Sequence, residues 1–150
     1  MSSRGLYEKI LLDHAKNPRN FKVPEVFDVK LEGFNPLCGD QFTFYLVFDG
    51  DSIEQVYFHG NGCAVSKASA SILTTLLEGK SKREALNIIE SFIKIMKTSP
   101  NEKIDEDKLG KMAVLVGVRE FPVRIKCATL PWHTVEKIIQ GETHSVVSTE

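Results

Sequence analysis

The period of the apolar pattern changes along the first third of the chain. Near the amino terminus apolar residues recur at helical spacing until Asn17-Pro18, which predicts a helix over about residues 5–16. Phe27, Val29 and Leu31 then alternate with charged residues, as in a half-buried strand. The chain is therefore expected to begin with a helix followed by a strand.

A second alternating stretch predicts a β-hairpin. Its apolar side chains share one face: Phe42, Phe44, Leu46 and Phe48. Asp49-Gly50-Asp51 has the composition of a hairpin turn, and Ile53 begins the returning strand. With the earlier strand, this hairpin makes a small three-stranded antiparallel sheet. The face that carries Tyr45 and Val47 could meet solvent or a helix, and we expect a helix there because so small a sheet needs cover to be stable.

Two helices are predicted after the hairpin. Small residues are frequent over residues 64–78 and are followed by leucines, which predicts a helix that can approach the sheet closely. Ser81 is followed three residues later by Glu84, the signature of a capping box, so a second helix is expected to begin there. Ser99-Pro100-Asn101 ends this second helix.

The last third predicts shorter or broken helices. One or two helical turns are expected over residues 105–118, and a last helix, interrupted or only beginning near Pro131, over residues 123–139. No repeat or linker divides the 150 residues, so we expect a single domain over residues 1–150 with a frayed tail over about 142–150. The predicted class is α+β, a small three-stranded antiparallel sheet packed with helices.

Charge and hydropathy argue against nucleic acid and membrane partners. The 19 basic and 20 acidic residues give a formal net charge of -1 without long blocks of one sign, so bulk electrostatics indicate no nucleic acid or anionic membrane partner. No apolar run approaches the roughly 18–20 residues of a membrane span, and the first residues lack the pattern of a signal peptide. We therefore expect a cytoplasmic protein.

The three cysteines and one aspartate carry the candidate chemistry. Three is an odd number and cytoplasmic thiols stay reduced, so metal binding or thiol chemistry explains them better than a disulfide framework. Cys38 and Asp40 flank Gly39, so their side chains can turn toward one point if the backbone is extended or looped. We predict that Cys63 and Cys127 converge on the same point and complete a metal and sulfur site.

Such a set of ligands suits zinc or iron. Both metals accept thiolates, and the three cysteines with one carboxylate supply a tetrahedral set. Cys63 lies at the expected start of a helix, whose positive end favours the thiolate. The carboxylate of Asp40 is harder than a thiolate, so we predict that it is the ligand most easily displaced. Arg124, Lys126 and Lys67 are candidates to compensate the negative charge of the site.

Each of these residues also has a plainer explanation. A cysteine in an apolar stretch is more often a small buried hydrophobe, as Cys127 is at helical spacing from Leu130, and Asp40 could simply form a turn. The histidines are further possible ligands or bases: His14, His59, His133 and His144. Of these, His59 is the best candidate because it stands four residues before Cys63. A cysteine-histidine hydrolase stays open, although no local signature supports it.

Three motifs around the cysteines resemble those of a known family. They cover residues 35–40 (Asn35-Pro36-Leu37-Cys38-Gly39-Asp40), residues 60–71 (which begin Gly60-Asn61-Gly62-Cys63-Ala64) and residues 121–132 (which begin Phe121-Pro122-Val123-Arg124-Ile125-Lys126-Cys127). In this order and context they resemble the motifs of the IscU/NifU-like iron-sulfur cluster assembly proteins, especially of the SufU branch. The similarity spans the chain from the first predicted helix to the last.

The resemblance implies a ligand set, a cofactor and partners. The implied zinc ligands are Cys38, Asp40, Cys63 and Cys127; the alternative is iron or a nascent 2Fe-2S cluster held by the three cysteines. A pyridoxal-phosphate cysteine desulfurase, SufS-like, is the implied partner, with downstream iron-sulfur assembly proteins or apo-proteins as acceptors. Cys38 matches the residue that accepts persulfide sulfur, and Arg124 matches a basic residue near that site.

Departures from the IscU pattern favour the SufU branch. IscU proteins carry a histidine immediately before the last cysteine, where this chain has Lys126, so the fourth ligand is Asp40 or an external group. Residues 86–118 look like the insertion that marks SufU. Only residues 121–124 remain of the chaperone-recognition stretch of IscU, which argues against dependence on a dedicated chaperone.

Three functions are compatible with these residues. The first is a zinc-dependent sulfurtransferase that accepts persulfide sulfur at Cys38 from a cysteine desulfurase and feeds iron-sulfur cluster biogenesis. The alternative is a scaffold that assembles and transfers a 2Fe-2S cluster. The third is a structural zinc domain with an interaction role.

Overall fold

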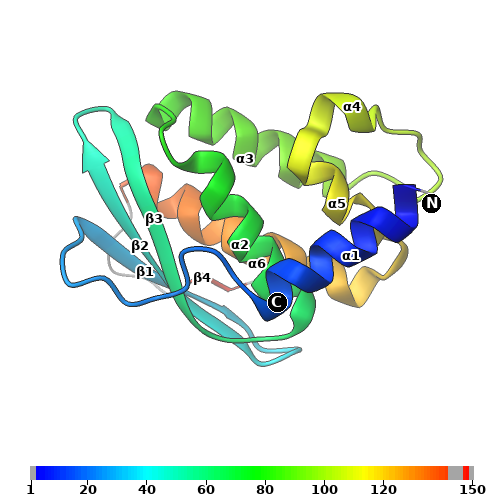
Figure 1. Ribbon diagram of the computed structural model, residues 1–150, viewed down its shortest axis with the longest axis horizontal. Helices are drawn as coiled ribbons and strands as arrows, with labels where there is room; N and C mark the ends of the chain where they lie inside the picture. The colour runs from blue at the N-terminus through cyan, green and yellow to red at the C-terminus, as the bar shows by residue number, and fades with distance from the viewer. Residues whose placement is uncertain (1–2, 142–146, 149–150) are drawn as a thin grey trace.

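Helices cover one face of a β-sheet in the computed structural model, which describes residues 3–141 and 147–148 (Figure 1). The strands are β1 Val29–Asn35, β2 Asp40–Asp49, β3 Ser52–Asn61 and β4 Val147–Ser148. They form a four-stranded sheet in the order β3-β2-β1-β4. The pairs β1–β2 and β2–β3 are antiparallel, and β4 is parallel to β1.

The α+β class and the antiparallel hairpin are confirmed, but the sheet has one strand more than predicted. Asp49 pairs with Ser52 across a turn in which Gly50 has a φ of 58°. The additional strand, β4, falls within the tail that was expected to be frayed, and residues 142–146 and 149–150 of that tail lie outside the described residues. A strand of two residues is too short for its alternation to be recognised.

The helices cover the opposite face of the sheet from the one predicted. Phe42, Phe44 and Leu46 are fully buried and belong to the core that the sheet shares with the helices. On the other face the Phe27 ring meets the Tyr45 ring edge-on, with 5.1 Å between ring centres. The expectation of a helix on the Tyr45 side is therefore wrong, because an aromatic residue from the segment before β1 covers that tyrosine instead.

Helix α2 occupies the middle of the helical layer (Figure 1). The longer helices are α1 Ser3–Lys16, α2 Ala64–Leu77, α3 Lys82–Met96 and α6 Pro122–Ile139. Helix α2 contacts α1, α6 and β3, which its small buried side chains make possible, and the capping box of Ser81 and Glu84 at the start of α3 is confirmed. Among the described residues, no helix has the length and apolar character needed to cross a membrane.

Polar groups align α6 against α2 inside the core. The Ser69 hydroxyl donates to the Ala128 carbonyl at 2.5 Å, and the Trp132 indole N–H donates to the Ser69 oxygen at 2.8 Å. The Trp132 ring stacks on Phe92 of α3 with 4.0 Å between ring centres. Since these buried donors and acceptors are all paired, the contact sets the position of α6 at little cost in desolvation.

Helix α6 continues through Pro131, so the break predicted there is wrong. A proline inside a helix removes the N–H that would bond to the Cys127 carbonyl, at a cost of roughly 3 kcal/mol. Leu130 and Trp132 beside it are fully buried, and burial of a large apolar side chain contributes about 1.5–3 kcal/mol. Tertiary packing on both sides of Pro131 therefore outweighs the local preference to break.

The segment before α6 forms several short helical pieces. They are α4 Glu106–Leu109, η1 Gly110–Met112, α5 Ala113–Val116 and η2 Gly117–Glu120. Gly110 has a φ of 56°, which ends α4. The buried Arg119 donates to the Thr98 hydroxyl and, at 2.9 Å, to the Ser99 carbonyl. This guanidinium ties the loop after α3 to the residues that lead into α6.

A glycine at the contact of β1 with α6 provides a test of this packing. A Cβ added at Gly33 would overlap the Thr134 hydroxyl and lie 3.2 Å from Leu130. We expect Gly33→Ala to lower the free energy of unfolding by about 1–3 kcal/mol, the usual cost of overpacking. Gly117→Ala is the control, because nothing lies within 4 Å of the added Cβ there. Denaturant titration measures both variants, and equal losses would contradict the explanation.

Candidate metal centre

The loop between β1 and β2 presents Cys38 and Asp40. Asn35 and Asp40 form the last pair of the two strands, and the Gly39 N–H donates to the Asn35 carbonyl at 2.8 Å. Gly39 has a φ of 72°, a conformation that residues with a Cβ seldom adopt. This tight turn places the half-buried Cys38 beside the fully buried Asp40.

Cys63 caps the amino end of α2, as predicted. Its sulfur accepts a hydrogen bond from the Ser66 N–H at 3.4 Å. The preceding Gly62 lies so close to the Phe42 ring that an added Cβ would stand 2.6 Å from it. The glycine thus allows the end of β3 to turn directly into α2 and leaves the half-buried Cys63 thiol at the positive end of the helix.

Cys127 approaches the loop from α6. It is fully buried, and its thiol donates to the Cys38 sulfur at 3.2 Å. Among the described residues, the ligand atoms of Cys38, Asp40 and Cys127 lie within 4.8 Å of one another, close enough to share an ion. Cys63 is outside this group, but its N–H donates to Asp40 Oδ1 at 2.9 Å. Three predicted ligands therefore lie together, and the fourth borders them.

Asp40 is held by neutral hydrogen-bond donors. Its Oδ1 accepts from the Cys63 N–H and, at 3.1 Å, from the Ser66 hydroxyl, while Oδ2 accepts from Asn35 Nδ2 at 3.2 Å. A buried carboxylate needs such partners to offset its desolvation. Asn35 and Ser66 were not among the predicted site residues. Their positions in the motifs, three residues before Cys38 and three after Cys63, were the available signal.

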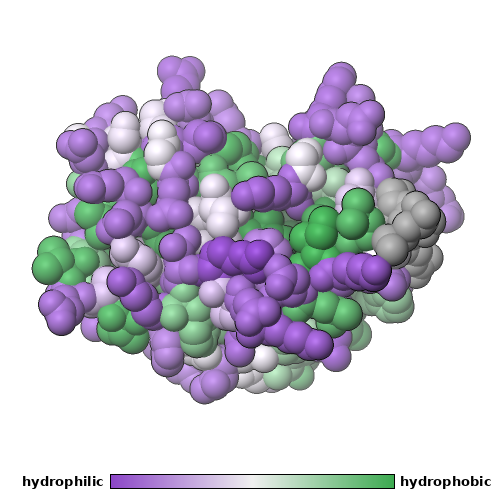
Figure 2. All heavy atoms as spheres, in the orientation of Figure 1, coloured by the Kyte–Doolittle hydropathy of each residue, from purple (hydrophilic) through white to green (hydrophobic). Residues whose placement is uncertain are grey.

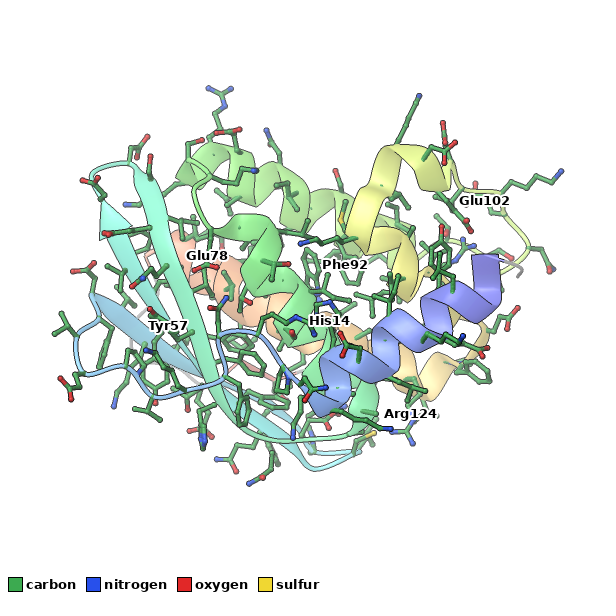
Figure 3. All side chains as sticks on the ribbon, viewed as in Figure 1. His14, Tyr57, Glu78, Phe92, Glu102 and Arg124 are labelled. Atoms are coloured by element: carbon green, nitrogen blue, oxygen red, sulfur yellow. The ribbon has the colours of Figure 1, made fainter. Side chains whose placement is uncertain are left out.

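One guanidinium approaches the sulfurs from the surface. Arg124, on the first turn of α6, donates to the Cys38 sulfur at 3.9 Å and projects outward (Figure 3). The pKa of Arg124 is raised, first by its hydrogen bond to Cys127 and then by its electrostatic interactions with the neighbouring cysteines. Lys67, also expected near the site, lies instead with its Nζ 5.2 Å from the centre of the Phe21 ring.

The environment of Cys127 favours the protonated thiol. Burial raises the pKa of Cys127 well above its usual value, and hydrogen bonds to Cys38 and Asp40 raise this pKa further. Without a metal ion, Cys127 therefore remains protonated near neutral pH. A divalent ion that binds the thiolate must displace this proton, so metal affinity is expected to rise with pH.

The histidines lie away from this group of ligands. His14 is buried between α1 and α2, where its Nδ1 lies 2.7 Å from the Ser71 oxygen (Figure 3). The exposed His59 packs its ring on Phe21, with 4.6 Å between ring centres. Burial lowers the pKa of His133, and His144 lies outside the described residues. Within the described chain, the group around Cys38 contains no histidine, so the structure offers no cysteine-histidine pair there.

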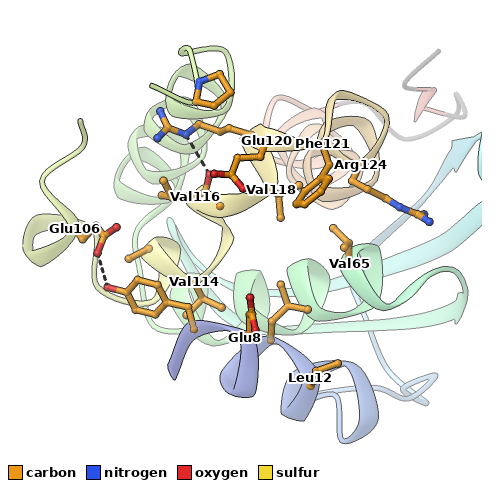
Figure 4. Close-up of a pocket in the computed structure, with 16 residues that line it drawn as sticks. Glu8, Leu12, Val65, Glu106, Val114, Val116, Val118, Glu120, Phe121 and Arg124 are labelled. Atoms are coloured by element: carbon orange, nitrogen blue, oxygen red, sulfur yellow. Dashed lines mark hydrogen bonds between the residues drawn. The ribbon is translucent and has the colours of Figure 1, made fainter. Parts of the chain in front are cut away.

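A cavity of about 520 Å³ opens beside the thiols (Figure 4). Residues of α1, α5, η2 and the start of α6 line it, among them Leu11, Val114 and Phe121. Apolar side chains also gather on the surface where α1 and α5 meet (Figure 2). Arg124 lines the cavity and also contacts Cys38, so the cavity adjoins the thiol group.

Comparisons with known proteins agree on one family. The family model described as NifU-like N terminal domain matches residues 6–128. The chain is 40% identical over 137 residues to the zinc-dependent sulfurtransferase SufU of Bacillus subtilis, and the match covers 91% of each chain. It is 39% identical over 141 residues to the iron-sulfur cluster assembly scaffold protein IscU of Streptococcus pyogenes, covering 93% of this chain and 86% of that protein.

A solved structure supports the same relationship. The crystal structure of a putative iron-sulfur cluster assembly scaffold protein for the SUF system from Fervidobacterium islandicum superimposes with a TM-score of 0.78 at 36% sequence identity. The match covers 90% of this chain and 97% of that one.

The unequal environments of the thiols predict unequal reactivity. In metal-free protein we expect iodoacetamide to modify Cys38 and Cys63, both half-buried, before the buried Cys127. The raised pKa of Cys127 adds to this difference, since each pKa unit lowers the thiolate fraction about tenfold. Peptide mass spectrometry after timed alkylation in the presence of a chelator measures the three rates. Modification of Cys127 as fast as Cys38 would show that the thiol is not shielded.

Proposed function

The chain belongs to the NifU-like N-terminal domain family, and from this we propose that it is an iron-sulfur cluster biogenesis protein whose Cys38 accepts persulfide sulfur from a cysteine desulfurase. We propose that it does so as one SufU/IscU-like domain over residues 1–150. The three free thiols suit a reducing compartment, so we place the reaction in the cytoplasm.

The unequal exposure of the clustered ligands is the observation that carries this proposal. Cys38 is half-buried on a loop, whereas Asp40 and Cys127 are fully buried. A sulfur donor on another protein can therefore reach Cys38 while the other two ligands stay inside. The Arg124 guanidinium at the rim is placed to attract an anionic persulfide.

The donor set fits zinc. Cys38, Asp40 and Cys127 lie within 4.8 Å of one another, and we propose that they hold zinc together with the bordering Cys63, because thiolates favour zinc and the carboxylate completes a tetrahedral set. When bound, zinc would keep the thiolates deprotonated at neutral pH. Asp40 is the harder ligand and the one we propose to leave first, since three hydrogen bonds already support its carboxylate. Lys126 occupies the position where IscU proteins have a ligand histidine.

The sulfur transfer itself needs only the Cys38 thiolate and the donor persulfide. The thiolate attacks the outer sulfur of a persulfide on the pyridoxal-phosphate cysteine desulfurase, a SufS-like partner. A new sulfur-sulfur bond forms at Cys38, the donor sulfur-sulfur bond breaks, and the donor cysteine leaves as a thiolate. No net oxidation or reduction occurs, so no further reactant is required.

A second candidate function is the assembly and transfer of a 2Fe-2S cluster. The similarity to a protein named as an IscU scaffold supports this alternative, as does the contact of the Cys127 and Cys38 sulfurs with Cys63 at the border of the group. In that case iron is cargo, and downstream iron-sulfur assembly proteins or apo-proteins receive the cluster from the three cysteines. The replacement of the ligand histidine by Lys126 favours the sulfurtransferase.

Anaerobic purification with metal analysis separates the two functions. We expect about one zinc ion per chain and no iron-sulfur absorption band, because three thiolates and a carboxylate match zinc. A reconstituted cluster that transfers intact to an apo-protein would instead establish the scaffold.

Incubation with a cysteine desulfurase and cysteine tests sulfur transfer. Mass spectrometry is expected to find one added sulfur on the Cys38 peptide, and Cys38→Ser is expected to abolish both this product and the stimulation of the desulfurase. Arg83→Gln, an exposed charge change on α3, is the control and should behave as wild type. Sulfur found only on another cysteine would refute the assignment of Cys38.

Arg124 is expected to assist without being essential. Because its guanidinium is exposed, Arg124→Gln should slow sulfur transfer to Cys38 by only about two- to fivefold, the effect typical of a surface charge contact. Stopped-flow or quenched assays at low and high salt measure the rate. The difference from wild type should shrink at high salt, and a salt-independent loss would exclude an electrostatic role.

A further inference from the structure

We propose that Asn35 is a positioning residue of the metal centre, an inference that rests on the proposed function. Its side-chain amide orients the Asp40 carboxylate and the Cys127 sulfur relative to each other. Asn35 lies at the end of β1 and is fully buried. Its Nδ2 donates to Asp40 Oδ2 at 3.2 Å and to Cys127 Sγ at 3.4 Å.

The orientation of this amide follows from a third contact. The Leu37 N–H donates to Asn35 Oδ1 at 3.2 Å, so the carbonyl side of the amide faces the loop backbone. The nitrogen side must then face Asp40 and Cys127, both of which can accept a hydrogen bond. A single amide group therefore combines two tasks: it supports the turn through its oxygen and contacts two ligands through its nitrogen.

Hydrogen bonding at Asp40 indicates which oxygen is available to a metal. Oδ1 already accepts from the Cys63 N–H and the Ser66 hydroxyl. Oδ2 accepts from Asn35. Each carboxylate oxygen has about two acceptor sites, so Oδ1 is filled, whereas Oδ2 accepts one bond from Asn35 and can turn its other site to a metal once Cys127 has lost its proton. The direction of that remaining site depends on where Asn35 holds the oxygen.

Asn35 also connects parts of the chain that are far apart in sequence. Asp40 starts β2, whereas Cys127 is on α6, 92 positions beyond Asn35. The two hydrogens of one nitrogen reach both ligands, so the amide fixes their spacing. It also brings partial positive charge to two groups that are negative when they bind a metal, without adding a net charge to the site.

Asn35→Asp separates the two tasks of the amide. Aspartate supports such turns as well as asparagine does, so the bond from the Leu37 N–H can persist. The donor to Asp40 and Cys127 is lost and replaced by a second carboxylate. Asn35→Ser removes the same donor without adding a charge, and it serves as the second variant if Asn35→Asp does not fold. Asn61→Asp is the matched control, since it adds the same charge at an exposed position near Cys63.

Two measurements are made on each folded variant, with circular dichroism to establish folding. Competition with a chromophoric chelator gives the zinc affinity, which we expect to fall about 10- to 100-fold in Asn35→Asp and Asn35→Ser, as is typical when a partner of a metal ligand is removed. Substitution with Co²⁺ gives sulfur-to-metal charge-transfer bands, which are expected to shift in both variants and to stay unchanged in Asn61→Asp.

The outcomes keep this inference apart from the proposed function. If folded Asn35→Asp and Asn35→Ser bind zinc and Co²⁺ as wild type does, Asn35 only supports the turn and the inference is overturned. The inference is also overturned if the wild-type protein binds neither ion. If the variants lose affinity while wild-type Cys38 acquires no sulfur from a desulfurase, the positioning role stands and the sulfurtransferase proposal fails.

Discussion

The contact between β1 and α6 is the constraint on which the site depends. Strand β1 ends in Asn35, whose pairing with Asp40 closes the loop that carries Cys38. Helix α6 carries Cys127, and it can approach β1 this closely because Gly33 has no Cβ where the Thr134 hydroxyl lies. A larger separation of strand and helix would move the Cys127 sulfur away from Cys38, so the packing of Gly33, two residues before Asn35 on β1, helps to set their distance.

Charge is arranged in layers around the thiol group. Inside, the Asp40 carboxylate is stabilised by backbone and side-chain dipoles from Asn35, Cys63 and Ser66, none of which carries a positive charge. Outside, Arg124 places a guanidinium next to the Cys38 sulfur. Because the donors that the described residues offer to Asp40 are neutral, the carboxylate retains its attraction for a metal ion, while a cation at the rim favours the approach of an anionic sulfur donor. The formal net charge of -1 gave no indication of this arrangement, because the effect is local.

Local patterns predicted most of the elements but not the packing between them. The hairpin, the capping box at Ser81 and the position of Cys63 follow from turn and cap chemistry, which acts over a few residues. The convergence of segments 92 positions apart was inferred from residue types and from family resemblance, since no local rule reaches that far. Pro131 was misjudged because burial of its neighbours outweighs the local penalty. The role of Asn35 could not be predicted, because the sequence of the turn is the same whether the Asn35 amide faces solvent or a ligand.

The unequal burial of the three thiols follows from the elements that carry them. Cys127 lies on the face of α6 that packs into the core, so its sulfur is shielded and its thiol is hard to ionise. Cys63 stands at a helix end, and Cys38 on a loop, where neighbouring side chains cannot surround the sulfur completely. A helix interior thus shields one thiol, while a helix cap and a turn leave the other two half-buried beside it. Because a metal centre needs firmly held ligands and sulfur transfer needs an approachable one, this combination of elements permits both at a single site.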